Sequence, residues 1–329
     1  MESNNVSQPH VDVVIITWNH HEHIVDCLEA LLTQDYPVFR VTVLDNASMD
    51  RTVEQIEAKF PTVMVLREES NTGFSKALNR AIKNTEGEYI LSLNPDVIVR
   101  PDFISRLVEA MADQRIGFAA PKLLRADDPQ LLDSTGLFLD SLRRPVDRGQ
   151  LEVDKGQYDG LRVIFGACGA AALYRREMLH DLAIHGEIFD EDFFAYYEDA
   201  DLSWRAQQLG WKGVFAPEAI ATHERGWGDT VRKVRGKANP AGQGPRLALR
   251  NYLLMLQKNP KPRMNLWERI RTSLYLLVKS LYLLALKPTA LNGWIEAFRL
   301  KKTMASKRDW IRKKSVLSDR DLREWFTHA

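Results

Sequence analysis

Residues 11–17 read V-D-V-V-I-I-T, a run of β-branched side chains typical of a strand buried on both faces of a parallel sheet. Apolar side chains then recur at helical spacing from Ile24 to Leu32, and Tyr36-Pro37 ends that helix. Further strands are expected at 41–44, 62–66, 88–93 and 116–120, with helices ending near 59, around 78–82 and starting at 101. This alternation predicts an α/β fold with a doubly wound, mostly parallel sheet flanked by helices.

Polar side chains follow the carboxyl ends of these strands, where open α/β sheets bind their ligands. They are Thr17 and Asn19, Asp45 and Asn46, and Asn94 and Asp96. A carboxylate at such a strand end is a ligand for Mg²⁺ or Mn²⁺, which usually keeps water and substrate phosphates in its shell. The alternative for Asp96 is a cap on the loop before Pro101.

The stretch 189–205 reads F-D-E-D-F-F-A-Y-Y-E-D-A-D-L-S-W-R and holds six carboxylates among aromatic side chains. Leu202, Ala206 and Leu209 recur at helical spacing after it, which places Glu198, Asp199 and Asp201 at a helix start. Acids also favour a first helical turn for electrostatic reasons alone. Desolvation among aromatics raises carboxylate pKa values, and this favours a catalytic or metal-binding role.

The charge of the chain is distributed unevenly, although the formal net charge is only +1. From Arg232 to the end there are 23 Lys and Arg against 6 Asp and Glu. The run Leu274–Leu286 is apolar but only 13 residues long and interrupted by Lys279, too short to span a bilayer. We therefore expect it to lie in the membrane interface, with packing on the catalytic domain or a homodimer as the alternative.

The polar segment 125–160 lacks periodicity and is expected to be a long loop. Four regions follow from composition: a flexible tail at 1–10, an α/β domain at 11–230, a flexible glycine-rich basic segment at 231–246 and a helical basic region at 247–329. The basic region alternates with long aliphatic runs, so a lipid surface suits it better than nucleic acid. Neither a dinucleotide-binding G-x-G-x-x-G nor a P-loop motif occurs.

Five blocks in this order resemble the family 2 glycosyltransferases of GT-A fold, in particular a bacterial branch of rhamnosyltransferases. They are V-V-I-I-T-W-N, V-L-D-N-A-S-M-D-R-T, N-T-G-F-S-K-A-L-N-R, L-N-P-D and the acidic stretch at 189–205. The resemblance covers roughly residues 11–226. It implies an inverting transferase that moves a sugar from a nucleotide donor, with Asp199 as the general base.

The resemblance also implies roles for the other polar residues. The nucleotide pocket would be lined by Thr17, Asn19, Asp45, Asn46, Asn71, Gly73, Lys76 and Asn94. The acceptor and sugar pocket would be shaped by Glu198, Asp201, Trp204 and Arg205. Asp96 and His223 would hold a divalent cation, Mg²⁺ or Mn²⁺. The family's D-x-D motif is N-P-D here, so its first acid is Asn94 and fewer charges are available to the metal.

The same resemblance suggests dTDP-L-rhamnose as donor, with a UDP- or GDP-linked sugar as the alternative. The acceptor is expected to be a polyprenyl-diphosphate-linked saccharide of cell-surface polysaccharide synthesis. The protein would then work in the cytoplasm, on the inner face of the cell membrane. A sugar-nucleotide-binding scaffold without catalysis is the rival interpretation, and the acids Asp96 and Asp199 argue against it.

Overall fold

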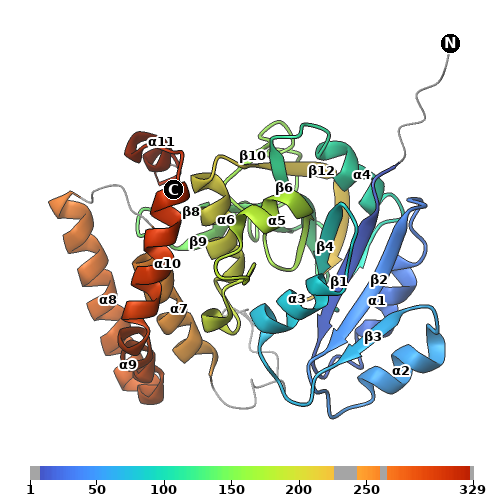
Figure 1. Ribbon diagram of the computed structural model, residues 1–329, viewed down its shortest axis with the longest axis horizontal. Helices are drawn as coiled ribbons and strands as arrows, with labels where there is room; N and C mark the ends of the chain where they lie inside the picture. The colour runs from blue at the N-terminus through green and yellow to red at the C-terminus, as the bar shows by residue number, and fades with distance from the viewer. Residues whose placement is uncertain (1–7, 226–242, 260–264, 327–329) are drawn as a thin grey trace.

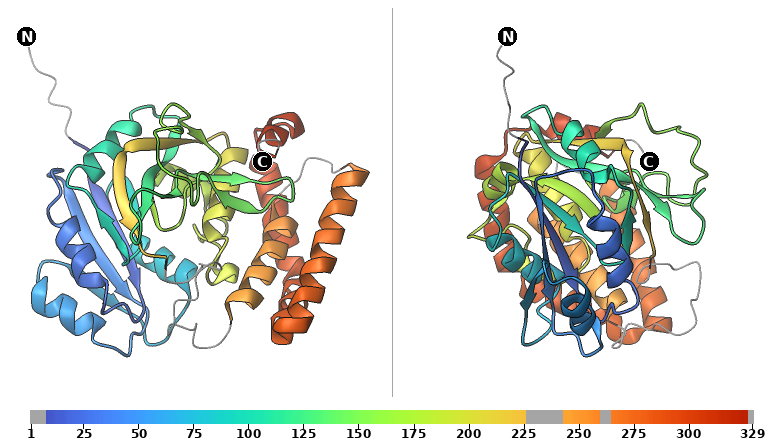
Figure 2. Two further views of the ribbon diagram at one scale, coloured as in Figure 1. Left: turned by 180° about the vertical axis from the view of Figure 1, so that it is seen from behind. Right: turned by 90° about the vertical axis from the view of Figure 1, so that its right-hand side faces the viewer.

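The computed structural model describes residues 8–225, 243–259 and 265–326. The tail at 1–7 and most of the predicted segment 231–246 lie outside the described residues. A central sheet with helices on both faces forms one half of the molecule, and helices from the C-terminal third stack along one end of it (Figure 1). The view from behind shows the same stacking (Figure 2).

The sheet has ten strands and mixed direction. Its first half is parallel: β1 (Val11–Thr17) lies between β2 (Phe39–Asp45) and β4 (Tyr89–Leu93), and β3 (Met64–Arg67) adds to β2. The antiparallel β11 (Ala171–Arg175) joins β4 to β6 (Ile116–Arg125), which pairs in parallel with β12 (Lys212–His223). The predicted mostly parallel, doubly wound sheet is confirmed.

Helices cover both faces of the sheet because each presents one apolar stripe to it. The cluster on one face includes buried side chains of α1 (Ile24–Leu31) and α4 (Phe103–Ala110). The other face is covered by α3 (Phe74–Lys83), α5 (Arg176–Leu182) and α6 (Glu198–Gln208). The outlying helix α2 (Thr52–Lys59) follows β2. These layers leave the carboxyl ends of the parallel strands free to carry a site.

The segment 125–160, expected to be one long loop, contains three short strands. They are β7 (Leu132–Ser134), β8 (Leu137–Leu139) and β9 (Pro145–Asp147). β7 pairs with β6, and β8 pairs with β9 in a separate two-stranded sheet. Three-residue strands are too short to show a period of two, so periodicity did not reveal them. The two-residue β10 (Val163–Ile164) and the short β5 (Val97–Val99) both pair with β12.

The C-terminal third is helical, as predicted. It comprises α7 (Gly244–Lys258), α8 (Leu266–Leu286), α9 (Asn292–Arg299), α10 (Lys301–Lys314) and α11 (Asp319–Glu324), with a 3₁₀ turn at Pro288–Leu291. A third apolar cluster joins α6 to α7 and to α9 and α10. The apolar run at 274–286 is the second part of the longer α8, which starts with a capping box between Asn265 and Glu268. In the part of the chain that the structure describes, no helix has the length and apolar character needed to cross a bilayer.

Candidate active site

The first part of the site is formed where β1 and β2 end. Thr17 lies opposite Asp45 in the parallel register, and the Asn46 amide donates to the carbonyl of Thr17 at 2.8 Å. Asn19 has a left-handed backbone with φ 58°, and its side-chain oxygen accepts from the Met49 amide at 2.8 Å. The sheet register therefore brings together the polar residues that the sequence placed after different strands.

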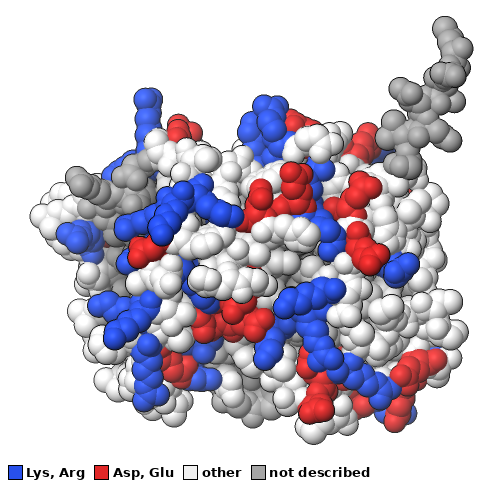
Figure 3. All heavy atoms as spheres, in the orientation of Figure 1, with Lys and Arg blue, Asp and Glu red and all other residues white. Residues whose placement is uncertain are grey.

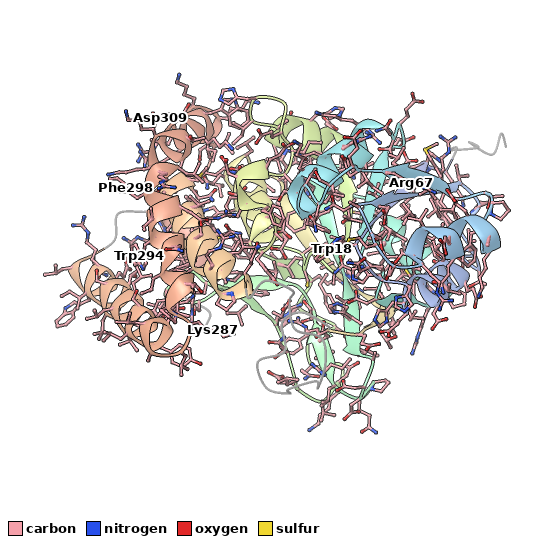
Figure 4. All side chains as sticks on the ribbon, turned by 90° about the horizontal axis from the view of Figure 1, so that it is seen from below. Trp18, Arg67, Lys287, Trp294, Phe298 and Asp309 are labelled. Carbon is pink, nitrogen blue, oxygen red and sulfur yellow. The ribbon has the colours of Figure 1, made fainter. Side chains whose placement is uncertain are left out.

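Asp45 lines a cavity of about 730 Å³, and its two carboxylate oxygens have different surroundings. Its Oδ2 accepts from the Ser48 amide at 3.0 Å, whereas its buried Oδ1 has no hydrogen-bond partner among the described residues. Trp18 and Arg67, both labelled in Figure 4, line the same cavity. A buried acceptor left without a donor is costly, so Oδ1 is well suited to a ligand N–H.

The turn at 71–73 forms the neighbouring wall, and Asn46 holds it in place. The Asn46 side-chain oxygen accepts from the Thr72 amide at 2.9 Å, and its nitrogen donates to Asn71 Oδ1 at 3.1 Å. Gly73 has φ 85°, and a Cβ there would lie 2.5 Å from the ring of Phe194. Only glycine fits this position, because both the backbone angle and the space exclude a side chain. Lys76 is exposed on α3, which starts after this turn.

Asp96 and His223 come together although 127 positions separate them in the sequence. His223 Nε2 lies 3.6 Å from Asp96 Oδ1, because β12 pairs with β5 directly after Asp96. The other ring nitrogen, Nδ1, is 2.8 Å from Oδ2 of the fully buried Asp133 on β7. Arg225 donates to Asp133 Oδ1 at 2.5 Å and to Asp147 Oδ2 at 2.6 Å. This chain of contacts fixes the orientation of the imidazole.

The pair Asp96 and His223 fits a divalent cation that takes its remaining ligands from water and phosphate. Asp96 Oδ1 is buried and accepts no hydrogen bond among the described residues. A carboxylate on the far side of the histidine is the usual partner of a metal-bound imidazole, and Asp133 occupies that position. Within the described ranges no group of three or more His, Cys, Asp or Glu side chains converges on a metal position. Two protein ligands are sufficient for Mg²⁺ bound with a diphosphate.

Asp199 lies in the first turn of α6 with no cationic partner among the described side chains. Its Oδ2 accepts from the Gly169 amide at 2.9 Å and its Oδ1 from the Ala200 amide at 2.7 Å. Burial raises the pKa of Asp199 to about 6, against the opposing effect of these two amides. Burial, reinforced by the charge of Asp199, raises the pKa of Glu198 to about 8. Both shifts favour the protonated form, so the pair holds a proton more readily than two exposed carboxylates would.

The loop before β11 connects this acid to the end of β4. The Asn94 amide donates to the carbonyl of Ala170 at 2.8 Å, and the adjacent Gly169 donates to Asp199. Asp96 follows Asn94 by two residues, so the candidate cation ligand and the candidate base are linked through two backbone segments that hydrogen-bond to each other. The structure thus brings Asp96, His223 and Asp199 to the same edge of the sheet.

Three residues expected in the acceptor and sugar pocket lie in the packed interior instead. The side chains of Asp201, Trp204 and Arg205 are essentially inaccessible. Asp201 accepts from Lys258 at 2.7 Å and from Asn259 at 2.9 Å, both at the end of α7. Trp204 packs edge-on against Phe165. Arg205 donates to Asp201 and to two backbone carbonyls. These contacts are structural, because all three side chains are buried against neighbouring parts of the fold, whereas the family resemblance implied a place in the pocket.

Sequence reasoning missed Asp133, Arg225 and Gly169. Asp133 and Arg225 were hidden because segment 125–160 was taken as a loop without a partner. Gly169 has a weak signal in the sequence, because the run G-A-C-G-A-A at 166–171 consists of small residues that permit a close approach of the backbone. A Cβ on Gly169 would lie 3.3 Å from Asp199 Oδ2, a tight contact that a glycine avoids.

Comparison with known proteins agrees with this arrangement. The model of glycosyl transferase family 2 matches residues 12–183. An N-acetylglucosaminyltransferase of Bradyrhizobium diazoefficiens is 28% identical over 228 residues, which cover 65% of this chain and 44% of the relative. An N-acetylglucosaminyl-diphospho-decaprenol L-rhamnosyltransferase of Mycobacterium tuberculosis is 26% identical over 243 residues, covering 65% of this chain and 75% of the relative. The chain spans about half the length of the N-acetylglucosaminyltransferases that it matches.

Solved structures share the fold at low sequence identity. The mannosyltransferase PcManGT from Pyrobaculum calidifontis, in complex with GDP-Man and Mn²⁺, aligns with a TM-score of 0.55 and 18% identity over 94% of this chain and 86% of that one. Residues 1–349 of S. aureus TarS with UDP align with a TM-score of 0.51 and 17% identity, over 97% and 93% of the two chains. The sheet, its carboxyl-edge site and the family match define a GT-A-type protein. The chain belongs to glycosyl transferase family 2.

Proposed function

We propose that the protein is an inverting glycosyltransferase in which Asp199 is the general base. The observation that carries this proposal is the environment of Asp199, a partly buried carboxylate with two backbone donors and no cationic partner among the described residues. A pKa of about 6 suits a general base, because the group is ionised at neutral pH yet basic enough to take a proton.

In the proposed reaction, Asp199 takes the proton of an acceptor hydroxyl while its oxygen attacks the anomeric carbon. The bond from that carbon to the donor's diphosphate oxygen breaks on the opposite face, so configuration inverts and no covalent enzyme intermediate forms. The transition state resembles an oxocarbenium ion. Asp96 and His223 would hold a divalent cation, which offsets the charge that develops on the leaving diphosphate.

The donor is proposed to be a nucleotide sugar whose base occupies the cavity beside Asp45. The free Oδ1 of Asp45 would accept from the ring N–H of a pyrimidine, a group that uracil and thymine share. The likeness to the mycobacterial rhamnosyltransferase supports dTDP-L-rhamnose. The likeness to the rhizobial N-acetylglucosaminyltransferases supports a UDP-linked sugar as the second candidate, and a GDP-linked donor is the third.

The acceptor is proposed to be a polyprenyl-diphosphate-linked saccharide on the cytoplasmic face of the membrane. The mycobacterial relative is named for a diphospho-decaprenol acceptor, which supports this class. The excess of Lys and Arg after residue 231 supports a location at an anionic surface.

A donor panel tests the proposal. The melting temperature is measured with dTDP-L-rhamnose, UDP-N-acetylglucosamine, UDP-glucose and GDP-mannose, each with and without Mn²⁺, since a ligand of the folded state raises it. One nucleotide sugar should stand out, with a larger shift in Mn²⁺, and it should be turned over when a polyprenyl-diphosphate saccharide is added. Stabilisation by a donor that is transferred to no acceptor would support the non-catalytic alternative.

A further inference from the structure

The outer face of α8 carries an apolar stripe that no described part of the chain covers. Its members are spaced by three and four residues and are between 46 and 74% exposed: Trp267, Ile270, Leu274, Leu277, Leu281 and Leu284. This spacing places them on one side of a helix. The 21 residues of α8 correspond to a length of about 30 Å. We name these six residues the α8 stripe.

The opposite side of α8 already has its partners. Tyr275 packs edge-on against Tyr252 of α7, with ring centroids 5.9 Å apart, and Leu283 is buried in the third apolar cluster. Arg271 donates to Ser141 Oγ at 2.9 Å. The packing of the fold therefore accounts for one side of the helix and leaves the α8 stripe without a role in it.

Helix α9 lies beside α8, since Trp294 Nε1 donates to Ser280 Oγ at 3.1 Å, and it carries exposed apolar side chains of its own. Phe298 is 73% exposed and Ile295 is 52% exposed. Trp294 and Phe298 lie at the edge of the molecule that the C-terminal helices form, on the side away from Arg67 (Figure 4). A surface formed by two helices is broader than the single seam through which two helices pair in a coiled coil.

The charge around this surface is positive. Exposed basic residues are carried by α8, by its C-cap and by the helices that follow: Arg269, Lys287, Arg299, Lys301 and Lys302. The two acids within 265–302 are engaged, Glu268 in its capping box and Glu296 with Arg246 and Arg250. Figure 3 shows Lys and Arg side chains over the C-terminal helices at the left of this face. A broad apolar face with basic surroundings complements an anionic bilayer.

We propose that the α8 stripe, together with Phe298, is a docking surface for a membrane that contains anionic lipid. The helix lies in the interface plane with its apolar side chains below the headgroups and the basic residues at their level. This surface extends the proposed membrane location. It is tested without donor or acceptor, so it fails independently of the transferase proposal.

The test is flotation of the full chain with phosphatidylcholine vesicles, with and without phosphatidylglycerol. The wild type should bind the anionic vesicles and lose binding at high salt. Replacing Leu274, Leu277 and Leu281 by Ser should lower the vesicle partition coefficient by more than about tenfold. The matched control replaces three exposed apolar residues elsewhere, Val146, Leu161 and Val163, by Ser and should bind as the wild type does.

Two results would overturn the proposal. One is a triple α8 variant that floats as well as the wild type. The other is a wild type that binds neither kind of vesicle and is a dimer by light scattering, while the triple variant is a monomer. The stripe would then be an interface between two copies of the chain.

A second, independent observation concerns the loop that leads into α6. Phe194, Tyr196 and Tyr197 have φ of 64°, 72° and 71°, in the left-handed region that side chains with a Cβ rarely adopt. Tyr197 is the residue directly before Glu198 and Asp199, where α6 begins. Such a backbone persists only where its surroundings determine it.

Asn251 of α7 holds much of this loop backbone in place. Its side chain is inaccessible, and its amide nitrogen lies 2.8, 2.7 and 2.8 Å from the carbonyl oxygens of Phe193, Ala195 and Tyr196. The neighbouring Arg250 donates to the Phe193 carbonyl at 2.8 Å. On the opposite side of the loop, the Ser75 amide donates to the carbonyl of Phe194 at 3.2 Å.

The geometry points to Asn251 as a positioning residue that sets the direction in which α6 starts and hence the place of Asp199. This role rests on the proposed function, since it matters for catalysis only if Asp199 is the base. It also gives the C-terminal helices a second task, because α7 would support the active site from behind.

The test compares Asn251→Ala with Asn259→Ala, an equally buried asparagine at the end of α7 that contacts the side chain of Asp201 and not the loop. Hydrogen exchange of the amides at 193–200 should speed up in Asn251→Ala and not in Asn259→Ala. With an active donor, kcat should fall by about tenfold or more in Asn251→Ala with an unchanged KM for the donor, because the base is misplaced and the nucleotide pocket is not.

The outcomes test the positioning role of Asn251 and the proposed function separately. Unchanged exchange at 193–200 in Asn251→Ala would overturn the positioning role whatever the activity is. Faster exchange with an unchanged kcat would show that the loop is held by Asn251 but that the base does not depend on it, and would overturn the role as well. A wild type without transferase activity, in which only Asn251→Ala speeds exchange, would refute the proposed function and leave the structural support of the loop in place.

Discussion

Asp199 and Asp201 lie two residues apart in the first turn of α6 and have opposite surroundings. Asp199 faces the sheet edge, where its only described donors are two backbone amides. Asp201 faces α7, from whose end Lys258 and Asn259 donate to it, and Arg205 of α6 itself donates to it as well. A helix turns by about 200° over two residues, which is enough to send the two carboxylates to different sides.

The same division extends to the rest of the acidic stretch. Asp190 contacts both Lys258 and Lys307, and although burial opposes its ionisation, these two cations hold its pKa well below the ordinary value. Among the described residues Glu198 has no such cation, and its pKa is raised. Burial alone therefore does not mark a functional acid, since acids of both kinds are buried. The absence of a cation beside the acid marks it, and only the fold reveals that absence.

Replacing Asp199 with Asn should have the largest effect. An amide cannot accept the proton of the acceptor hydroxyl, so transfer should fall by roughly 1,000-fold or more. The folded protein should not be destabilised, because the substitution removes a charge whose burial is unfavourable. Activity is measured with the donor that the panel identifies, and the melting temperature is measured in parallel. Retained turnover would refute the assignment of Asp199 as base.

Replacing Asp201 with Asn should have the reverse effect on stability. Removing one partner of a buried ion pair leaves Lys258 partly uncompensated, which typically costs about 3–5 kcal/mol of unfolding free energy. Urea denaturation of Asp201→Asn, Lys258→Met and the double variant measures this. The double variant should lose less than the sum of the single ones, because the two substitutions share one interaction. An Asp201→Asn variant as stable as Asp199→Asn would contradict the comparison.

Asp133 extends the comparison to a buried acid outside the stretch. Although burial opposes ionisation, the hydrogen bond from His223 and the charge of Arg225 hold the pKa of Asp133 below its ordinary value. Asp133→Asn should weaken Mn²⁺ binding by about 10- to 100-fold, because it loosens the imidazole of His223. Isothermal titration with Mn²⁺ and a nucleoside diphosphate measures the affinity. Asp154→Asn, which alters the pair with Lys122, is the control and should bind as the wild type does.

Much of this architecture was predictable from local patterns. The β-branched run at 11–17 and the helical periodicity after it predicted the sheet, and the strand ends located Asp45 and Asp96. The partners of the acids were not predictable, since Lys258 is 57 residues from Asp201 and lies in a region whose charge suggested a surface role. The family resemblance placed Trp204 and Arg205 in the pocket, and their helical positions could not correct this, because position alone does not say which side of α6 faces α7.

The remaining prediction concerns pH and is the smallest effect. Because the pKa of Asp199 is raised to about 6, kcat should fall about tenfold for each pH unit below 6 and level off above it. The free energy of unfolding should change with pH in the opposite direction to kcat. Raised pKa values of Asp199 and Glu198 mean that the folded state binds more protons than the unfolded chain between their ordinary values and about 8, so the unfolding free energy should decrease as pH rises through that range.

Asp199→Asn separates the pH dependence of stability that Asp199 causes from the pH dependence that the acids in ion pairs cause. It should flatten the decrease in stability with rising pH, whereas Asp190 contributes stability that is present at neutral pH and is lost only in strong acid. Urea midpoints of the wild type and Asp199→Asn at pH 5, 6, 7 and 8 therefore report on the unpaired acids alone. Parallel pH profiles for the two proteins would mean that Asp199 is screened by a cation outside the described residues, and the distinction between the two sides of α6 would then no longer hold.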